Sequence, residues 1–268
     1  MRPARHWETH NWADTLPAIL GIRHPPVDLY AVARHRRIRS VGFRFMIPRG
    51  LMLPVEGGFE VYLRDQMRRD ADVSKGEPEG ALSVRQRFSL AHEIAHTRFY
   101  RLSDPIPCPQ PITSNGRELE DICDQMAGCI LIPTSLLKRK IHDYGKEVDA
   151  NFVRLITQDF RTSMTVALER LRVVEAGSSS NRCILLARRI HGDAEIQTLH
   201  FGIGLWPLLP RPEKYTRVTD WLPDFPRNAF TRSEDNGSFV TPKGRTITFK
   251  TSEVGTSDRI LLELRAGS

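Results

Sequence analysis

One ten-residue stretch decides the fold of this chain. Residues 87–96 read RFSLAHEIAH and contain the pattern His-Glu-x-x-His at His92, Glu93 and His96. Residues four positions apart on an α-helix lie on the same face, so the two imidazoles can bind one metal ion together. Glu93 follows the first histidine directly and is placed to accept a proton from a metal-bound water. The stretch therefore predicts a helix that carries two metal ligands and a general base.

The neighbouring residues predict the bounds of this helix. Ser83 and Gln86 have the spacing of a capping box, which marks a helix start. Apolar residues then recur on one helical face at positions 84, 88, 91, 95 and 99. We expect a helix from about residue 84 to about residue 101, ending before Pro105.

A second helix offers the third metal ligand. A catalytic zinc site has three protein ligands and a fourth position open to water. Glu120 and Asp124 lie four positions apart, so Glu120 can bind the metal while Asp124 accepts the second N–H of a ligand histidine. Glu118 and Asp121 are weaker candidates, because neither has an acidic residue four positions on. The alternative is that these acidic residues form a first helical turn favourable to the helix dipole.

Beyond the spacing, the sequence resembles a known family. The matching motifs are residues 87–96, the sequence EDICDQMA at 120–127, and LIP at 131–133. Shorter matches flank them at residues 26–29, 50–54, 160–163 and 169–171. Over roughly residues 25 to 175, the chain is similar to the ImmA/IrrE family of gluzincin-type metallopeptidases.

The resemblance implies a ligand set and a base. By it, His92, His96 and Glu120 are the metal ligands and Glu93 is the catalytic base. Such a ligand set suits Zn²⁺, and imidazole–carboxylate sites also accept Mn²⁺. The oxyanion of the reaction needs a further hydrogen-bond donor. The candidates with donor groups are Tyr62, His142, Tyr144 and Arg98.

The chain as a whole is predicted to be α+β. We expect a zincin-like metallopeptidase domain over residues 1–148, a helix-turn-helix-like helical segment over 149–177, and a small β-rich C-terminal domain over 181–268. Short strands are expected between residues 42 and 63, and again in runs at 183–190, 195–203, 245–251 and 259–264. The C-terminal domain is interpreted as a sensor, a dimerisation surface or a substrate platform.

Composition excludes several classes of protein. Of the 268 residues, 40% are hydrophobic and 26% are charged, which suits one large domain or two modest domains with hydrophobic cores. The first residues contain no apolar stretch typical of a signal peptide, and apolar runs such as 129–132 are too short to span a bilayer. The four cysteines lack CxxC spacing, which disfavours a disulfide framework. We therefore expect a cytoplasmic protein that does not bind membranes.

Two functions from different classes fit these observations. The resemblance implies a metal-dependent endopeptidase, a regulatory protease that cleaves a partner transcriptional repressor, often of helix-turn-helix type. We expect its protein substrate to bind in extended form beside the strand at residues 59–63. A member linked to a toxin or a phage would use the same chemistry.

The alternative is a DNA-binding regulator on a metallopeptidase-like scaffold without proteolytic activity. It rests on the net charge of +7, the basic run at residues 34–39, and the arginines of the helical segment at 149–177. We do not favour it, because Arg170 and Arg172 fall where a recognition helix would end.

Overall fold

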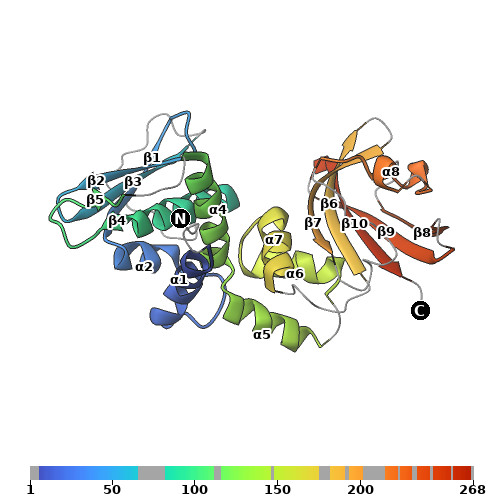
Figure 1. Ribbon diagram of the computed structural model, residues 1–268, viewed down its shortest axis with the longest axis horizontal. Coiled ribbons are helices and arrows are strands. Elements are labelled where there is room, and N and C mark those ends of the chain that lie inside the picture. The colour runs from blue at the N-terminus through green and yellow to red at the C-terminus, as the bar shows by residue number, and fades with distance from the viewer. Residues whose placement is uncertain are drawn as a thin grey trace. The chain divides into compact units, whose positions relative to one another are not determined.

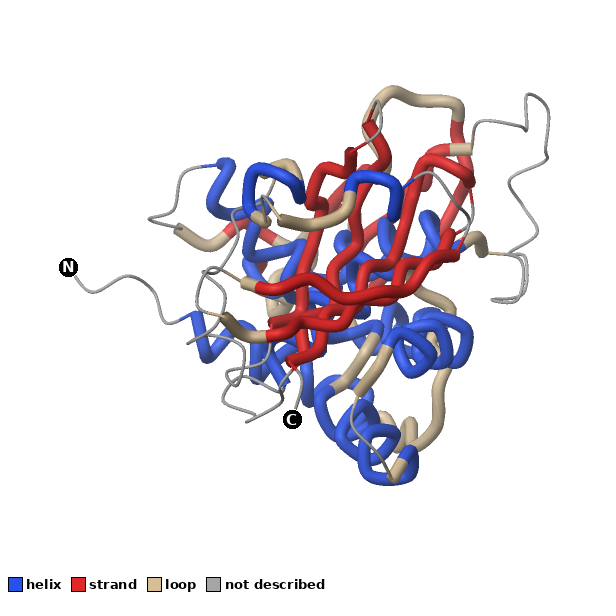
Figure 2. The backbone as a smooth tube through the Cα atoms, turned by 90° about the vertical axis from the view of Figure 1, so that its right-hand side faces the viewer, coloured by secondary structure: helices blue, strands red, loops and turns tan. Residues whose placement is uncertain are grey.

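The structure is a computed structural model that describes most of the chain. The described residues are 6–65, 82–111, 116–145, 148–174, 182–190, 193–201, 215–222, 224–230, 234–241, 244–254 and 256–266. Helices and strands are both present (Figure 2). The strand pairs are parallel as well as antiparallel. The predicted α+β class is therefore confirmed. The chain divides into two compact units, Met1–Leu137 with Asp159–Ser163, and Lys138–Gln158 with Met164–Ser268.

The first unit combines helices with a three-stranded sheet (Figure 1). Its helices and turns are α1 (His6–Ile19), α2 (Leu29–His35), α3 (Val84–His96), η2 (Thr97–Phe99) and α4 (Gly116–Leu131), and α5 (Thr134–Tyr144) begins in it. Its strands are β1 (Ile38–Arg44), β2 (Gly50–Val55), β3 (Gly58–Arg64), β4 (Tyr100–Arg101) and β5 (Cys108–Pro109). The larger sheet has the order β1-β3-β2, so β3 is its central strand.

The central position of β3 overturns one expectation about substrate binding. Strand β1 pairs with β3 in parallel and β2 pairs with it antiparallel, so both hydrogen-bonding edges of β3 are occupied. An extended substrate therefore cannot bind beside residues 59–63, and that prediction is wrong. The buried residues Phe59, Val61 and Leu63 alternate with less buried ones, and this pattern is the same in a central strand and an edge strand. The edges of the sheet are β1 and β2.

Helix α3 begins where the capping box predicts. The side chain of Ser83 accepts a hydrogen bond from the Gln86 amide at 3.2 Å, and the Gln86 side chain accepts one from the Ser83 amide at 3.0 Å. These bonds satisfy two backbone donors that a helix start leaves unpaired. The predicted start at residue 84 is confirmed.

The end of α3 differs from the prediction. The helix stops at His96, and the single turn η2 leads into β4, so the expected extension to about residue 101 is wrong. The Thr97 hydroxyl donates to the Ile94 carbonyl at 2.6 Å and accepts from Arg36 Nε at 3.0 Å. Tyr100 then pairs with Pro109 in a two-stranded sheet. These tertiary contacts, which periodicity does not register, turn the chain away from the helix axis.

Helix α4 packs against α3 and α1 within the first unit. The apolar side of this helix is buried, with Cys123, Met126 and Ile130 fully inaccessible. The exposed side of its first two turns carries acidic residues. The two helices that contain the predicted ligands are therefore neighbours.

The second unit is built on a five-stranded antiparallel sheet (Figure 1). Its elements are α6 (Ala150–Asp159), α7 (Met164–Val174), β6 (Arg182–Ile190), β7 (Asp193–Phe201), α8 (Val218–Trp221), η4 (Arg227–Phe230), β8 (Glu234–Val240), β9 (Thr246–Val254) and β10 (Thr256–Ala266). The strand order is β7-β6-β10-β9-β8. One face forms a core with α8 and the segment after it, and α7 contacts β7 and β6.

The helical pair at residues 149–174 is present as α6 and α7, which cluster with this sheet. Residues 175–181, where the predicted helical segment ends and the predicted C-terminal domain begins, lie outside the described residues. The domain limits at 148, 177 and 181 stay a prediction. No helix within the described residues has both the length and the apolar character that crossing a membrane requires.

Candidate metal centre

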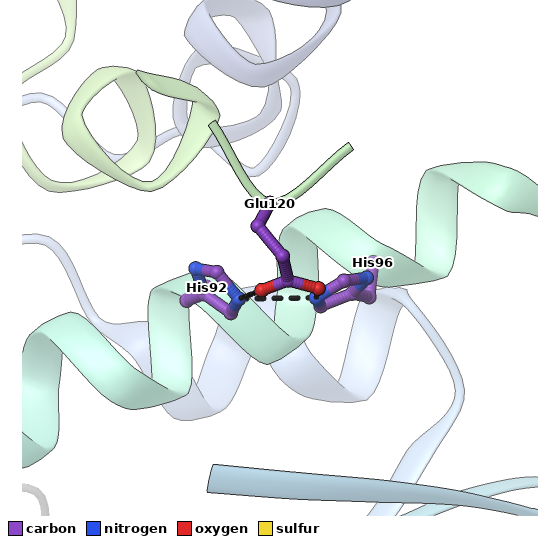
Figure 3. Close-up of side chains that lie close together, drawn as sticks. All are labelled: His92, His96 and Glu120. Atoms are coloured by element: carbon purple, nitrogen blue, oxygen red, sulfur yellow. Dashed lines mark hydrogen bonds and ion pairs between the residues drawn. The ribbon is translucent and has the colours of Figure 1, made fainter. Parts of the chain in front are cut away.

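Three side chains from two helices converge on one point. His92 and His96 project from α3 and the carboxylate of Glu120 from α4 (Figure 3). The two histidine Nε2 atoms lie 3.0 Å apart, and they lie 3.0 and 3.4 Å from the Glu120 oxygens. Ligand atoms around a tetrahedral zinc ion lie about 3.3 Å apart, given metal–nitrogen bonds of about 2.0–2.1 Å. The donor set and its spacing therefore fit one divalent cation.

The second ring nitrogen of His92 is held by a carboxylate. His92 Nδ1 lies 2.8 Å from Asp124 Oδ1, so the ring donates its N–H there and keeps its lone pair at Nε2. Burial opposes protonation of His92, but the hydrogen bond to Asp124 and the charges of Asp124, Glu93 and Glu120 together outweigh burial and raise the pKa of His92. The structure thus places Asp124 beside a histidine of the cluster, as the spacing predicts.

Glu93 lies at the same cavity without joining the cluster of three. Its side chain is buried, with 7% of its surface exposed. The pKa of Glu93 is raised to about 7, chiefly by burial, while the charge of His92 opposes the rise and the charge of Glu120 adds to it. A carboxyl group with a pKa near neutrality can both accept and release a proton.

The cavity has a volume of about 580 Å³ and is open to solvent on one side. The loop before β2 and the start of β2 form one wall, α3 forms the floor, and α4 contributes Glu120 and Asp124. Its lining residues are Pro48, Arg49, Gly50, Leu51, Met52, Phe88, Ser89, His92, Glu93, His96, Tyr100, Glu120 and Asp124.

The four oxyanion donors predicted from the sequence do not line this cavity. Tyr62 donates to Glu60 at 2.8 Å and lies under the Arg44 guanidinium, 3.7 Å from the ring centre. Arg98 stacks over Trp12.

His142 and Tyr144 fall in the other compact unit. His142 is exposed, and Tyr144 donates to Asp149 at 2.7 Å. The weaker ligand candidates Glu118 and Asp121 are also exposed and lie outside the lining.

Two donors at the cavity were missed by the sequence analysis, Tyr100 and Arg49. Tyr100 follows His96 by four residues, the same spacing that relates His96 to His92, and this signal was overlooked. Arg49 precedes β2, and only the packing of β2 against α3 brings it to the cavity.

These features define the class of the first unit. A capped helix with the His-Glu-x-x-His pattern, a carboxylate from the next helix, and a buried glutamate at a shared cavity are the parts of a metallopeptidase-like domain. A peptidase family model described as "IrrE N-terminal-like domain" matches residues 81–172. The resemblance to the ImmA/IrrE family is therefore confirmed over the residues that this model matches.

One solved structure has a similar fold over most of the chain. It is a Mycobacterium tuberculosis transcriptional regulator with a TM-score of 0.54 and 13% sequence identity, and the match covers 97% of this chain and 88% of that one. At this identity the likeness concerns the fold alone. No curated protein sequence matches the chain.

Gly50 on β2 lies against Glu93, which gives a first prediction. A Cβ atom at residue 50 would lie 2.3 Å from Glu93 Oε1, and the backbone of Gly50 is not in the left-handed region. We expect Gly50→Ala to fold, to lose about 1–3 kcal/mol of stability through overpacking, and to displace the Glu93 carboxylate. Urea unfolding and a crystal structure of the variant check this.

Gly116→Ala is the matched control, because nothing lies within 4 Å of a Cβ built at that position. Its stability should be unchanged or slightly raised. A Gly50→Ala structure with Glu93 in its original place would contradict the prediction.

Proposed function

We propose that this chain is a metal-dependent endopeptidase that regulates transcription by cleaving a partner repressor protein. The observation that carries the proposal is the convergence of His92, His96 and Glu120 at the cavity that also contains Glu93. The family assignment supports peptidase chemistry. The similar structure is named a transcriptional regulator, which agrees with a regulatory role.

His92, His96 and Glu120 would hold the metal ion, with Zn²⁺ or Mn²⁺ as the expected cofactor. When bound, such an ion polarises the scissile carbonyl and lowers the pKa of water beside it. Asp124 keeps the His92 ring oriented with its Nε2 lone pair toward the cluster.

Glu93 is the general base of the proposed reaction. It accepts a proton from the attacking water and transfers that proton to the leaving amine. Its buried position and its pKa of about 7 support both halves of this transfer. Gly50 supports the geometry, because its missing side chain leaves room for the carboxylate.

Tyr100 is the donor that we assign to the oxyanion. It lines the cavity with His96 and Glu93, and its ring packs edge-to-face on the fully buried Phe59, with centroids 5.2 Å apart. Burial and the charge of Glu93 raise its pKa, so the hydroxyl keeps the proton that it donates. A donor held by packing needs little reorganisation during the reaction.

The substrate is proposed to add to strand β2 as an extended segment. Strand β2 is an edge of the sheet, and Gly50, Leu51 and Met52 line the cavity. The Arg64 amide donates to the Arg49 carbonyl across the β2–β3 pair, so the backbone groups of Arg49 face β3. Since these groups alternate in direction along a strand, the Met52 amide points away from β3. That amide is available to a substrate strand beside the metal centre.

The contacts of the arginines give little support to the DNA-binding alternative. In the basic run at 34–39, Arg36 donates to Thr97, Arg37 to the Gly57 carbonyl, and Arg39 to the Glu56 carbonyl. These arginines hold the first unit together, so the run is not a free phosphate-binding patch.

The arginines of the helical pair are engaged as well. Arg172 pairs with Glu169 at 2.8 Å, Arg154 donates to the Glu253 carbonyl, and Arg170 is buried. Helix α7 also contacts the five-stranded sheet, which covers part of the surface that a recognition helix would present to DNA.

The ligand set is tested by elemental analysis of protein purified without chelators. We expect about one zinc or manganese per wild-type chain, and loss of most of it in His96→Ala and Glu120→Ala, because removal of one of three ligands leaves an incomplete site. Glu118→Ala is the matched control in the same helical turn and should keep the metal.

Catalysis is tested by the appearance of new protein N-termini in cells that express the wild type or Glu93→Gln. A terminus that appears only with the intact glutamate identifies the substrate. Full metal occupancy with no such terminus, together with binding of duplex DNA at physiological salt, would contradict the proposal and favour the DNA-binding regulator.

The role of Tyr100 is tested with the substrate so identified. Tyr100→Phe should lower kcat by about a hundredfold, because one oxyanion donor is lost, and should leave KM and metal content near wild type. Tyr62→Phe removes the same atom outside the cavity and should keep full activity. Equal kcat in the two variants would exclude Tyr100 as the donor.

The edge-strand mode is tested with Met52→Pro. This change removes an amide that points away from the sheet, so the β2–β3 ladder should survive while KM rises by about tenfold or more, the loss expected for a hydrogen bond. Met52→Ala keeps the amide and serves as the control for the lost side chain. Unchanged cleavage kinetics in Met52→Pro would refute binding along β2.

A further inference from the structure

The two histidines of the metal centre have unlike neighbours at their second ring nitrogen. His92 Nδ1 contacts the Asp124 carboxylate, whereas His96 Nδ1 lies 3.5 Å from the sulfur of Cys123. Both neighbours come from α4, at adjacent positions. A ligand histidine donates its second N–H to an acceptor that fixes the ring and its tautomer. A thiol at this position is a weak acceptor in place of an oxygen.

The orientation of His96 decides which nitrogen faces the metal. Its Nε2 lies 3.0 Å from His92 Nε2 and 3.4 Å from Glu120 Oε1, so this nitrogen belongs to the converging set. To offer a lone pair there, the neutral ring must carry its proton on Nδ1. The Nδ1–H then points at Cys123 Sγ, within the distance of an N–H···S hydrogen bond.

The position of Cys123 suits it to orienting His96 rather than to reacting chemically. The side chain is fully buried. The thiol faces Nδ1 of His96, the ring nitrogen that lies away from the converging donors.

We infer that Cys123 is a positioning residue of the metal centre, which accepts the Nδ1–H of His96 and holds its Nε2 toward the metal. The inference rests on the proposed function only in that it requires metal binding, and it does not require peptidase activity. Three residues of α4 thus have different roles: Glu120 binds the metal, Asp124 orients His92, and Cys123 orients His96.

The test compares Cys123→Val with Cys123→Ser in the full chain. Valine fills the buried space but accepts no hydrogen bond, whereas the serine hydroxyl does. Zn²⁺ affinity is measured by competition with a chromophoric chelator, and the visible absorption bands of the Co²⁺-loaded protein report the ligand geometry. We expect Cys123→Val to bind Zn²⁺ at least tenfold more weakly with altered Co²⁺ bands. Cys123→Ser should bind within about threefold of wild type.

Cys129→Val is the matched control, because this cysteine is buried on the same helix but lies six positions beyond Cys123. It should change neither Zn²⁺ affinity nor the Co²⁺ bands. If Cys123→Val does not fold, as judged by circular dichroism, Cys123→Ala takes its place with the same expected result.

Three outcomes overturn the inference. The inference is wrong if Cys123→Val keeps the wild-type Zn²⁺ affinity and Co²⁺ bands, or if Cys123→Val and Cys129→Val lose equal affinity. Either result would show that the thiol only fills space, and the proposed function would not be affected. Failure of the wild type itself to bind Zn²⁺ or Co²⁺ would instead overturn both proposals.

Discussion

The packing of α3 on α4 is the interaction on which the metal centre depends. It brings two imidazole lone pairs and a carboxylate to within 3.0–3.4 Å of one another, and such groups repel unless a cation lies between them. Buried apolar residues of both helices, among them Ile94 and Met126, hold the pair together. Hydrophobic burial thus supplies the free energy that keeps the donors converged.

The same packing explains how a short segment of α4 serves the centre in several ways. Glu120, Cys123 and Asp124 have the spacing i, i+3 and i+4, which places them on one side of a helix. From that side, the carboxylates contact His92 and the thiol contacts His96. A shift of one helical residue would therefore misplace all three groups together.

The features that could be predicted from the sequence are those that depend on local helix geometry. The pattern at His92 and His96, the capping box at Ser83, and the spacing of Glu120 and Asp124 are helical relations, which hold wherever the helix lies. The unpredicted parts depend on tertiary contacts. The end of α3 depends on Arg36, which is distant in sequence, and on the pairing of Tyr100 with Pro109. Strand order has no local signal either, so the central position of β3 could not be read from its alternation.

Two helices, α1 and α5, were also missed for local reasons. Helix α1 contains Pro17, and α5 begins directly after Pro133, and a proline is read as a helix breaker. A proline near the start of a helix removes only an amide that would have no partner there. Pro133 is therefore compatible with the start of α5 at Thr134.

Net charge was the least informative feature for function. The excess of +7 pointed to nucleic acid, yet Arg36, Arg37 and Arg39 donate to backbone or side-chain oxygens within their own unit. A guanidinium group offers five donors, and carbonyl acceptors do not reduce its formal charge. The net charge therefore counts structural arginines and phosphate-binding arginines alike. For this chain, the hydrogen-bond partners of the arginines distinguish structural from phosphate-binding roles, and those partners argue for the metal centre as the functional site.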